Sequence, residues 1–136
     1  MRKRNLIWLV PAFMVWVLLV GMGPPPGQDV PKPEIDFKAT VTDTQDIATK
    51  LHHASWNGNI FFTAVRGKGI VTISFEKIRK VAAVGTGGEN KMDFQITLRS
   101  GEVVAVSLEE DSKLLGVTTY GTFRIPAKNI KEITFD

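Results

Sequence analysis

His52 and His53 are the only histidines of the chain and the first candidates for acid-base or metal chemistry. Adjacent residues on a strand point their side chains to opposite faces, so two neighbouring imidazoles on one strand cannot bind a single ion together. No residue at metal-ligand spacing accompanies them. We therefore expect both histidines in a loop or at the surface, without a catalytic or metal-binding role.

Two other segments have compositions that are found in ion-binding loops. The acidic run Glu109–Asp111 lacks the alternating ligand order of a calcium loop, and a solvated hairpin turn explains it. Residues 84–92 read VGTGGENKM, in which Met92 follows Lys91 where a phosphate-binding loop requires Ser or Thr. We interpret the glycine-rich part of this segment as a connector.

The chain contains no cysteine, which excludes disulfide frameworks, cysteine-ligated zinc, c-type haem attachment and thiol nucleophiles. The GxSxG pattern of a serine nucleophile on a strand-helix turn does not occur in the sequence either. The sequence therefore predicts no catalytic, cofactor-binding or metal-binding residue, and we expect the protein not to be an enzyme.

The chain has a formal net charge of +3 and a pI near 9.3. Three basic residues, Arg2–Arg4, stand at the N-terminus, and the remaining basic residues equal the 14 acidic residues in number. Two small basic groups, Arg79 with Lys80 and Lys128 with Lys131, are explained by solvated strand faces. We therefore expect no nucleic-acid partner.

The N-terminus has the pattern of an export signal, because Arg2–Arg4 precede an uncharged, mainly apolar stretch, Leu6–Met22. As a helix this stretch would reach about 26 Å, close to the minimum for crossing a bilayer. We interpret residues 1–23 as a single-pass anchor in the inner membrane, with the N-terminus in the cytoplasm and the following domain in the periplasm. A cleaved signal peptide is the alternative, since Gly21 and Gly23 are small residues of the kind signal peptidase prefers, and it would leave a secreted or periplasmic protein.

Residues 24–34 form a proline-rich linker, with five prolines between Pro24 and Pro33. Such a segment favours the polyproline II conformation and acts as a semi-rigid spacer of about 3.1 Å per residue. We expect it to hold the folded part away from the membrane.

From residue 35 onward the sequence predicts an all-β domain. Residues 36–42 alternate apolar and polar side chains, which is the period of a half-buried strand. Residues 46–56 have a helical alternative, but we favour a strand as far as Leu51. The other predicted strands are rich in Val, Ile, Thr and Phe and comprise residues 59–65, 69–75, 92–98, 102–108, 114–120, 122–125 and 131–135.

The β region contains an internal repeat. DFKATV at residues 36–41 matches DFQITL at residues 93–98, an offset of 57 residues. A second template, GxxxIxxxxIxx followed by Val or Ile, begins at Gly69 and again at Gly121, an offset of 52 residues. Two matches in the same order, with the spacing inside each one maintained, indicate a tandem duplication.

We predict two tandem repeats, residues 35–85 and 91–136, joined by a connector at residues 86–90. Each repeat is expected to contain about five short antiparallel strands, and the pair could form two small barrels of the Sm or SH3 type or one joint sandwich. Pro126 cannot donate a hydrogen bond to a neighbouring strand, so it should mark a strand end or an edge. We expect Trp56 to be buried under a loop. The aromatic residues expected in the core are Phe37, Phe61, Phe75, Phe94, Phe123 and Phe135.

The second repeat carries a recognisable pattern. Residues 119–126 read TYGTFRIP and are followed by Ile130 and Ile133. This segment resembles the TxYGxxxIPxxxIxxI pattern met in uncharacterised bacterial envelope proteins, and Leu98–Glu102 resembles the LxxGE hairpin that accompanies it. The likeness is closer in the second repeat than in the first, where Ser74 stands at the proline position. The resemblance implies an envelope β-module and brings no activity with it.

These features predict a membrane-tethered or exported protein of the cell envelope that acts as a binding, scaffolding or assembly module. It would contact the membrane through Leu6–Met22 and bind an envelope protein as its partner. A carrier of a small ligand or lipid, held in a pocket between the repeats, is the alternative from a different class. A small envelope enzyme is the third.

Overall fold

The computed structural model describes residues 32–136. The predicted anchor or signal, residues 1–23, and residues 24–31 of the predicted linker lie outside the described residues. Within residues 32–136, no helix has the length and apolar character needed to cross a membrane.

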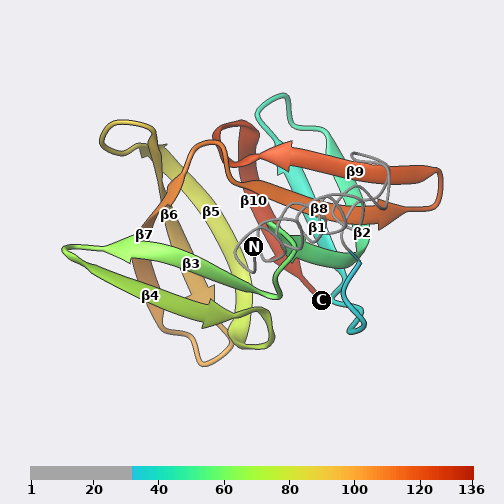
Figure 1. The fold of residues 1–136 in the computed structure, drawn as a ribbon, viewed down its shortest axis with the longest axis horizontal. Coiled ribbons are helices and arrows are strands. Elements are labelled where there is room, and N and C mark those ends of the chain that lie inside the picture. The colour runs from blue at the N-terminus through green and yellow to red at the C-terminus, as the bar shows by residue number, and fades with distance from the viewer. Residues whose placement is uncertain (1–31) are drawn as a thin grey trace, which may run out of the picture.

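The described chain forms one antiparallel sheet of ten strands that curls on itself (Figure 1). Between residues 32 and 136 there are two short 3-10 helices and no α-helix. The elements are β1 (Ala39–Asp43), β2 (Ala48–Trp56), β3 (Phe61–Arg66), β4 (Gly69–Ser74), η1 (Phe75–Lys77), β5 (Ile78–Thr86), β6 (Lys91–Leu98), β7 (Val103–Glu109), β8 (Lys113–Thr118), β9 (Gly121–Pro126), η2 (Ala127–Asn129) and β10 (Ile130–Phe135).

The all-β prediction is confirmed, and the strands lie close to the ranges predicted from alternation. The segment with a helical alternative, residues 46–56, contains β2, which continues past Leu51 to its end at Trp56. The two short helices η1 and η2 follow β4 and β9 directly. Pro126 is the last residue of β9, and β9 is an edge strand, as its missing N–H predicted.

The strands follow the order β4-β3-β7-β6-β5-β10-β1-β2-β8-β9. This order has an internal symmetry. Read inward from one end it is β4, β3, β7, β6 and β5, and read inward from the other end it is β9, β8, β2, β1 and β10, so each strand corresponds to the one five places away in the chain. The sheet thus divides into a β4 half (β4-β3-β7-β6-β5) and a β9 half (β10-β1-β2-β8-β9), which meet where β5 pairs with β10 (Figure 1). Each half contains strands from residues 35–86 and from residues 91–136.

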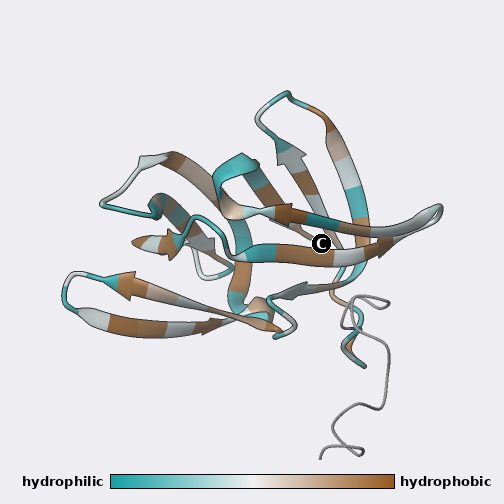
Figure 2. Ribbon diagram, turned by 45° about the horizontal axis from the view of Figure 1, so that its top comes forward, coloured by the Kyte–Doolittle hydropathy of each residue, from teal (hydrophilic) through white to brown (hydrophobic). Residues whose placement is uncertain are grey.

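Apolar residues recur along the strands of both halves (Figure 2) and form a common core. At its centre, Phe62 and Phe75 of the β4 half pack on Trp56 and Phe135 of the β9 half. The ring centroids are 4.8 Å apart for Trp56 and Phe62, and also for Phe75 and Phe135. Trp56 is 3% exposed, which confirms its expected burial. Aromatic rings from both halves thus share one buried cluster.

Most phenylalanines expected in the core are buried there or pack against its margin: Phe37, Phe75, Phe94, Phe123 and Phe135. The prediction was wrong for Phe61, which is only half-buried, whereas its neighbour Phe62 is fully buried. Residues 60–65 read IFFTAV and are apolar on both faces, so alternation alone could not fix which face turns inward.

Candidate functional site

The two histidines lie where the segment before β1 meets β2. His53 has a φ of 52° at a bulge in β2, so the alternation expected of a regular strand does not hold here. His52 Nδ1 lies 3.2 Å from Asp36 Oδ2, and His53 Nδ1 lies 3.0 Å from the carbonyl oxygen of Pro33. Both rings therefore contact the N-terminal segment, with His52 exposed and His53 half-buried.

Asp36 is the centre of this contact. Its carboxylate also accepts a 2.6 Å hydrogen bond from the backbone N–H of His53. This bond, followed by that of the His52 ring, holds the pKa of Asp36 below its ordinary value against the opposing effect of burial. Within residues 32–136, no group of three or more His, Cys, Asp or Glu side chains is placed to hold a metal ion. The cluster fastens the chain entering the domain to β2.

The charged segments singled out in the sequence lie at the surface. The acidic run begins at Glu109, the last residue of β7, and continues into the turn before β8, while residues 87–90 make the turn between β5 and β6. The hydrogen bond from Lys131 to Asp46 raises the pKa of the lysine. Three of the four basic residues noted in the sequence face an acidic partner: Lys80 with Glu132, Lys128 with Asp111, and Lys131 with Asp46.

Two grooves open at matching places in the two halves. The β4 groove, beside β4, has a volume of about 420 Å³, and the β9 groove, beside β9, has a volume of about 370 Å³. Residues of the two grooves correspond at the offset of 52: Val71 with Phe123, Thr72 with Arg124, Ile73 with Ile125, Ser74 with Pro126 and Lys77 with Asn129. Equivalent positions of an edge strand and the 3-10 helix after it therefore line both grooves, whereas the other lining residues differ.

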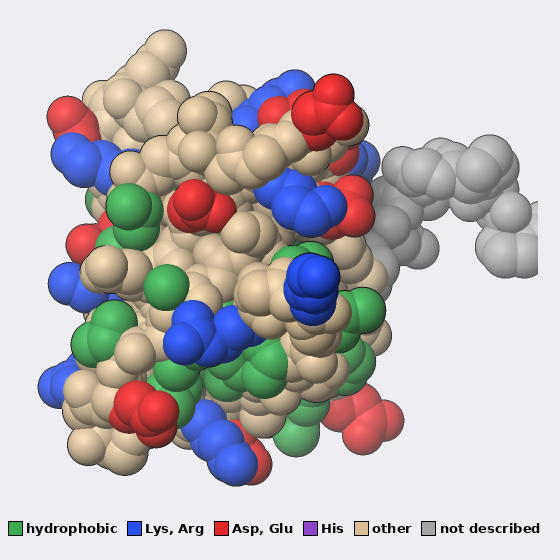
Figure 3. Space-filling model, turned by 90° about the vertical axis from the view of Figure 1, so that its left-hand side faces the viewer, with side chains coloured by type: hydrophobic (Ala, Val, Ile, Leu, Met, Phe, Trp, Pro, Cys, Tyr) green, Lys and Arg blue, Asp and Glu red, His purple; other side chains and the backbone are tan. Residues whose placement is uncertain are grey.

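The β4 groove is mainly apolar. Its walls come from β3, β4, β6 and β7, and Lys77 is its one charged lining residue. Figure 3 shows the side of the molecule that the β4 half occupies, where hydrophobic side chains gather between scattered Lys and Arg. The apolar lining residues are Phe61, Val71, Ile73, Leu98 and Val104.

The β9 groove is more polar. The end of β1 supplies Asp43, the turn after it supplies Thr44 and Gln45, and the strand β9 adds Arg124. Asp43 is already engaged, because its Oδ1 accepts hydrogen bonds from the backbone N–H groups of Gln45 and Ile47. This groove offers polar contacts and little apolar surface to a partner.

The edge of β4 carries no protection against pairing. Its sequence, GIVTIS, has no charged residue and no proline, and among residues 32–136 β4 pairs only with β3. A two-residue turn joins the strands, so Gly69, Val71 and Ile73 exchange hydrogen bonds with β3. The backbone N–H and C=O groups of the alternate residues, Ile70 and Thr72 among them, therefore point to the free side.

The edge of β9 carries two devices that discourage pairing. Its sequence is GTFRIP, and the two-residue turn after β8 places Arg124 and Pro126 at the positions whose backbone groups point outward. Pro126 has no N–H to offer, and a charged side chain such as Arg124 is a common protection of sheet edges. The two edges of one sheet thus differ in their readiness to accept another strand.

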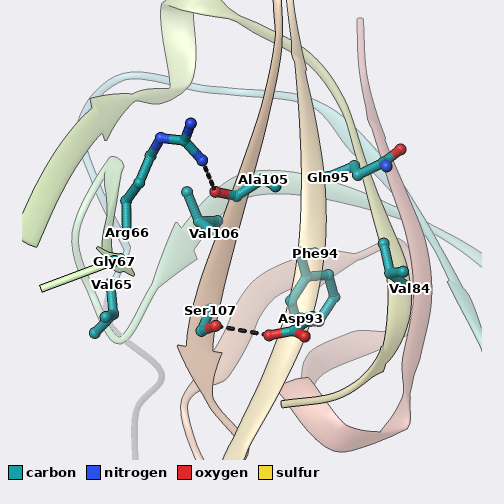
Figure 4. A pocket seen from close by; sticks show the side chains of 10 residues that line it. All are labelled: Val65, Arg66, Gly67, Val84, Asp93, Phe94, Gln95, Ala105, Val106 and Ser107. Atoms are coloured by element: carbon teal, nitrogen blue, oxygen red, sulfur yellow. Dashed lines mark hydrogen bonds between the residues drawn. The ribbon is translucent and has the colours of Figure 1, made fainter. Parts of the chain in front are cut away.

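A third groove, of about 230 Å³, lies between β3 and the β6–β7 hairpin (Figure 4). Three of its polar side chains, Arg66, Asp93 and Ser107, already have hydrogen-bond partners. The Arg66 guanidinium donates to the carbonyl oxygen of Ala105 at 2.8 Å, and the Ser107 hydroxyl donates to Asp93 at 2.7 Å. The first contact bridges the loosely paired β3–β7 seam, the second joins β7 to β6, and both leave fewer groups for a ligand.

The β4 groove was not predicted from the sequence. A signal existed in the comparison of GIVTISF with GTFRIPA, where only the first segment lacks both charge and proline. That comparison required knowing that both strands lie at edges, which depends on pairings between distant segments.

No curated protein and no solved structure shows significant similarity to this chain. Residues 33–136, which include every strand of the sheet, match the model of a protein family described as "Uncharacterised protein", and the chain belongs to that family.

Proposed function

We propose that this protein is an exported or membrane-tethered component of the cell envelope whose β domain acts as a binding or scaffolding module. The proposed anchor spans the inner membrane once through Leu6–Met22, with the domain in the periplasm. The basic Arg2–Arg4, the uncharged stretch and the proline-rich linker support this arrangement. Cleavage after the stretch would give a secreted or periplasmic form of the same module.

The observation that carries the binding role is the β4 groove beside the unprotected edge of β4. An exposed edge strand supplies main-chain hydrogen bonds to an added strand, and neighbouring pockets supply side-chain specificity. Exposed Ile70, which is 76% accessible, and Val103, which is 55% accessible, extend the apolar character of the β4 half.

We further propose that the domain arose by duplication, with residues 35–85 and 91–136 as the two copies and residues 86–90 as their connector. The symmetric strand order supports this origin. Residues 69–78 and 121–130 also have the same pattern of buried, half-buried and exposed positions. In this interpretation each five-stranded half is a curled unit of the small-barrel kind, assembled from strands of both copies.

Fractionation of cells that express the full chain tests the location. An anchored protein stays with the inner membrane, keeps its N-terminal residues and exposes the β domain to protease added from the periplasmic side. A cleaved form begins after Gly23 or close to it and is found in the soluble periplasmic or secreted fraction. Recovery of an intact chain from the cytoplasm would overturn the proposal.

A lipid or small-ligand carrier is the second candidate, because the β4 groove is apolar and large enough for an alkyl chain. Its walls come from segments on both sides of the connector. Native mass spectrometry of the full chain, released gently from detergent, distinguishes the two functions. A carrier retains a bound small molecule of defined mass, whereas a protein-binding module does not.

A further inference from the structure

We propose that the partner of β4 is a second copy of this chain, with the two β4 strands antiparallel about a two-fold axis at Thr72. The inference names the occupant of the surface described above and rests on the proposed binding function. Three features of one short segment support it: the direction of its backbone groups, its apolar side chains and the charges at its ends.

The backbone groups of β4 allow this register. With Thr72 on the axis, Thr72 lies opposite itself and Ile70 lies opposite Ser74. All three residues direct their N–H and C=O groups away from β3, so each opposed pair exchanges hydrogen bonds. A shift by one residue would oppose outward-pointing groups with groups already bonded to β3, which excludes the neighbouring registers.

The same register joins the apolar side chains. Val71 of one copy lies opposite Ile73 of the other, on the side of the sheet where both line the β4 groove. A second β4 strand therefore adds apolar side chains next to the groove of each copy. Ile70, on the other face, gains a neighbouring strand that reduces its exposure.

The charges at the two ends of β4 are also self-complementary. Lys68 stands in the turn before β4 and Glu76 follows β4, so the antiparallel register brings Lys68 of each copy towards Glu76 of the other. Both residues are exposed, and neither forms an ion pair within residues 32–136. A contact between identical surfaces about a two-fold axis closes as a dimer.

The β9 edge lacks this complementarity. Arg124 occupies the position that corresponds to Thr72, so a β9 pair in the same register would place two arginines together at the axis. Pro126 would also remove a donor from each end of that pair. The structure thus provides a matched control at the other end of the same sheet.

A cysteine crosslink tests the contact, because the natural chain contains no cysteine. Opposed residues in a hydrogen-bonded antiparallel pair have Cα atoms about 5.5 Å apart, within the range of a disulfide. Full-length Thr72→Cys in its membrane or in detergent should oxidise to a covalent dimer, whereas Arg124→Cys should stay monomeric. Mixed Ile70→Cys and Ser74→Cys chains should crosslink to each other more than to themselves. Equal crosslinking at both edges, or no crosslink at Thr72→Cys, would overturn the inference.

A charge exchange provides a second, non-covalent test by sedimentation of the full chain in detergent. Lys68→Glu should weaken the dimer by about tenfold at low salt, since it opposes two glutamates at each end. Adding Glu76→Lys to that variant should restore the affinity, and a double variant as weak as the single one would contradict the proposed register. A monomer that sits correctly in the envelope and binds a different protein would end this inference and leave the proposed function intact.

Discussion

The β4 half and the β9 half have the same strand pairings and yet present different surfaces. In the β4 half, η1 joins the edge strand β4 to β5, and in the β9 half, η2 joins the edge strand β9 to β10. Ile73 and Ile125 occupy matching buried positions and are 8% and 6% exposed. The positions that face outward differ, since Thr72 and Ser74 on β4 correspond to Arg124 and Pro126 on β9.

This difference shows that the two sets of positions have separate physical roles. Buried isoleucines set the fold of each half, because a hole or a charge there costs several kcal/mol. Outward-facing edge residues contribute little to the core, so a change there alters what the edge can bind while leaving the sheet intact. Arg124 and Pro126 on β9 discourage the addition of a strand, and the corresponding residues of β4, Thr72 and Ser74, do not.

The largest effect is expected from a charge placed in the common core on the side of either half. Ile73→Asp and Ile125→Asp should each destabilise the domain by more than about 4 kcal/mol, because each buries an unpaired carboxylate. Circular dichroism during chemical denaturation should show loss of the whole β signal for both variants, since the aromatic core links the halves. Ile47→Asp, at an exposed position just before β2 and away from the β4 edge, should leave stability nearly unchanged. Retention of half the signal in one variant would mean that the halves fold independently.

A smaller effect is expected at the seam between β2 and β8. A Cβ on Gly116 would lie 2.9 Å from the Cβ of Leu51, so glycine allows these strands to approach closely. Gly116→Ala should therefore cost about 1–3 kcal/mol through overpacking. Gly85→Ala is the control, because a Cβ there meets nothing within 4 Å. The midpoint of urea unfolding measures both, and equal midpoints would show that the seam can widen without cost.

The overpacking is expected only at the β2–β8 seam, as the corresponding β3–β7 seam of the β4 half shows. Ala64 stands in β3 at the offset of 52 from Gly116, and β3 pairs with β7 only at Val65 and Ser107. In the β9 half, by contrast, β2 and β8 are paired near His52 and again at the end of β2. Ala64, which has a Cβ, thus lies at the sparsely paired β3–β7 seam, whereas Gly116 lies at the more fully paired β2–β8 seam.

Local pattern predicted the strands well, because alternation of apolar and polar residues depends only on neighbours in sequence. Glycine pairs and Pro126 marked turns and an edge for the same local reason. The pairing of β3 with β7 and of β8 with β2 could not be derived in this way. It joins segments more than 40 residues apart in the case of Val65 and Ser107, and no local signal encodes the choice between partners.

The candidate site was missed for a related reason. The β4 groove combines Phe61 with Val104, and the neighbouring edge of β4 is free because no other strand within residues 32–136 pairs there. At the histidines, the bulge at His53 changed the assumed geometry, because a left-handed φ at a non-glycine residue has no reliable signal in the sequence. The alternation predicts Asp36 as part of a strand, whereas β1 begins at Ala39 and the Asp36 carboxylate contacts the His52 ring and the His53 backbone N–H.

Two serines, one in each half, should respond to alanine with opposite signs. The Ser55 hydroxyl is fully buried and has no hydrogen-bond partner in the part of the chain that the structure describes, so Ser55→Ala should stabilise the domain by up to about 1 kcal/mol. Ser107→Ala should destabilise it by a similar amount, because the Ser107 hydroxyl donates to Asp93. Thermal unfolding of the two variants gives the comparison, and a loss of stability in Ser55→Ala would mean that its hydroxyl has a partner in solution.

The smallest effect is expected from acid at the N-terminal contact. The pKa of Asp36 is lowered in the folded chain, so ionised Asp36 stabilises the fold above its unfolded pKa, and this contribution is lost as the pH falls through the folded pKa. Asp36→Asn should therefore be slightly less stable than the natural chain near neutral pH, and the difference should shrink below about pH 4. Urea midpoints measured from pH 7 to pH 3 test the trend. Asp93 corresponds to Asp36 at the offset of 57, but its carboxylate accepts a hydrogen bond from the Ser107 hydroxyl and not from a histidine. Asp93→Asn is therefore the control for the loss of a carboxylate that has no histidine partner. A difference between Asp36→Asn and the natural chain that stays constant down to pH 3 would show that the histidine contacts do not depend on the charge of Asp36.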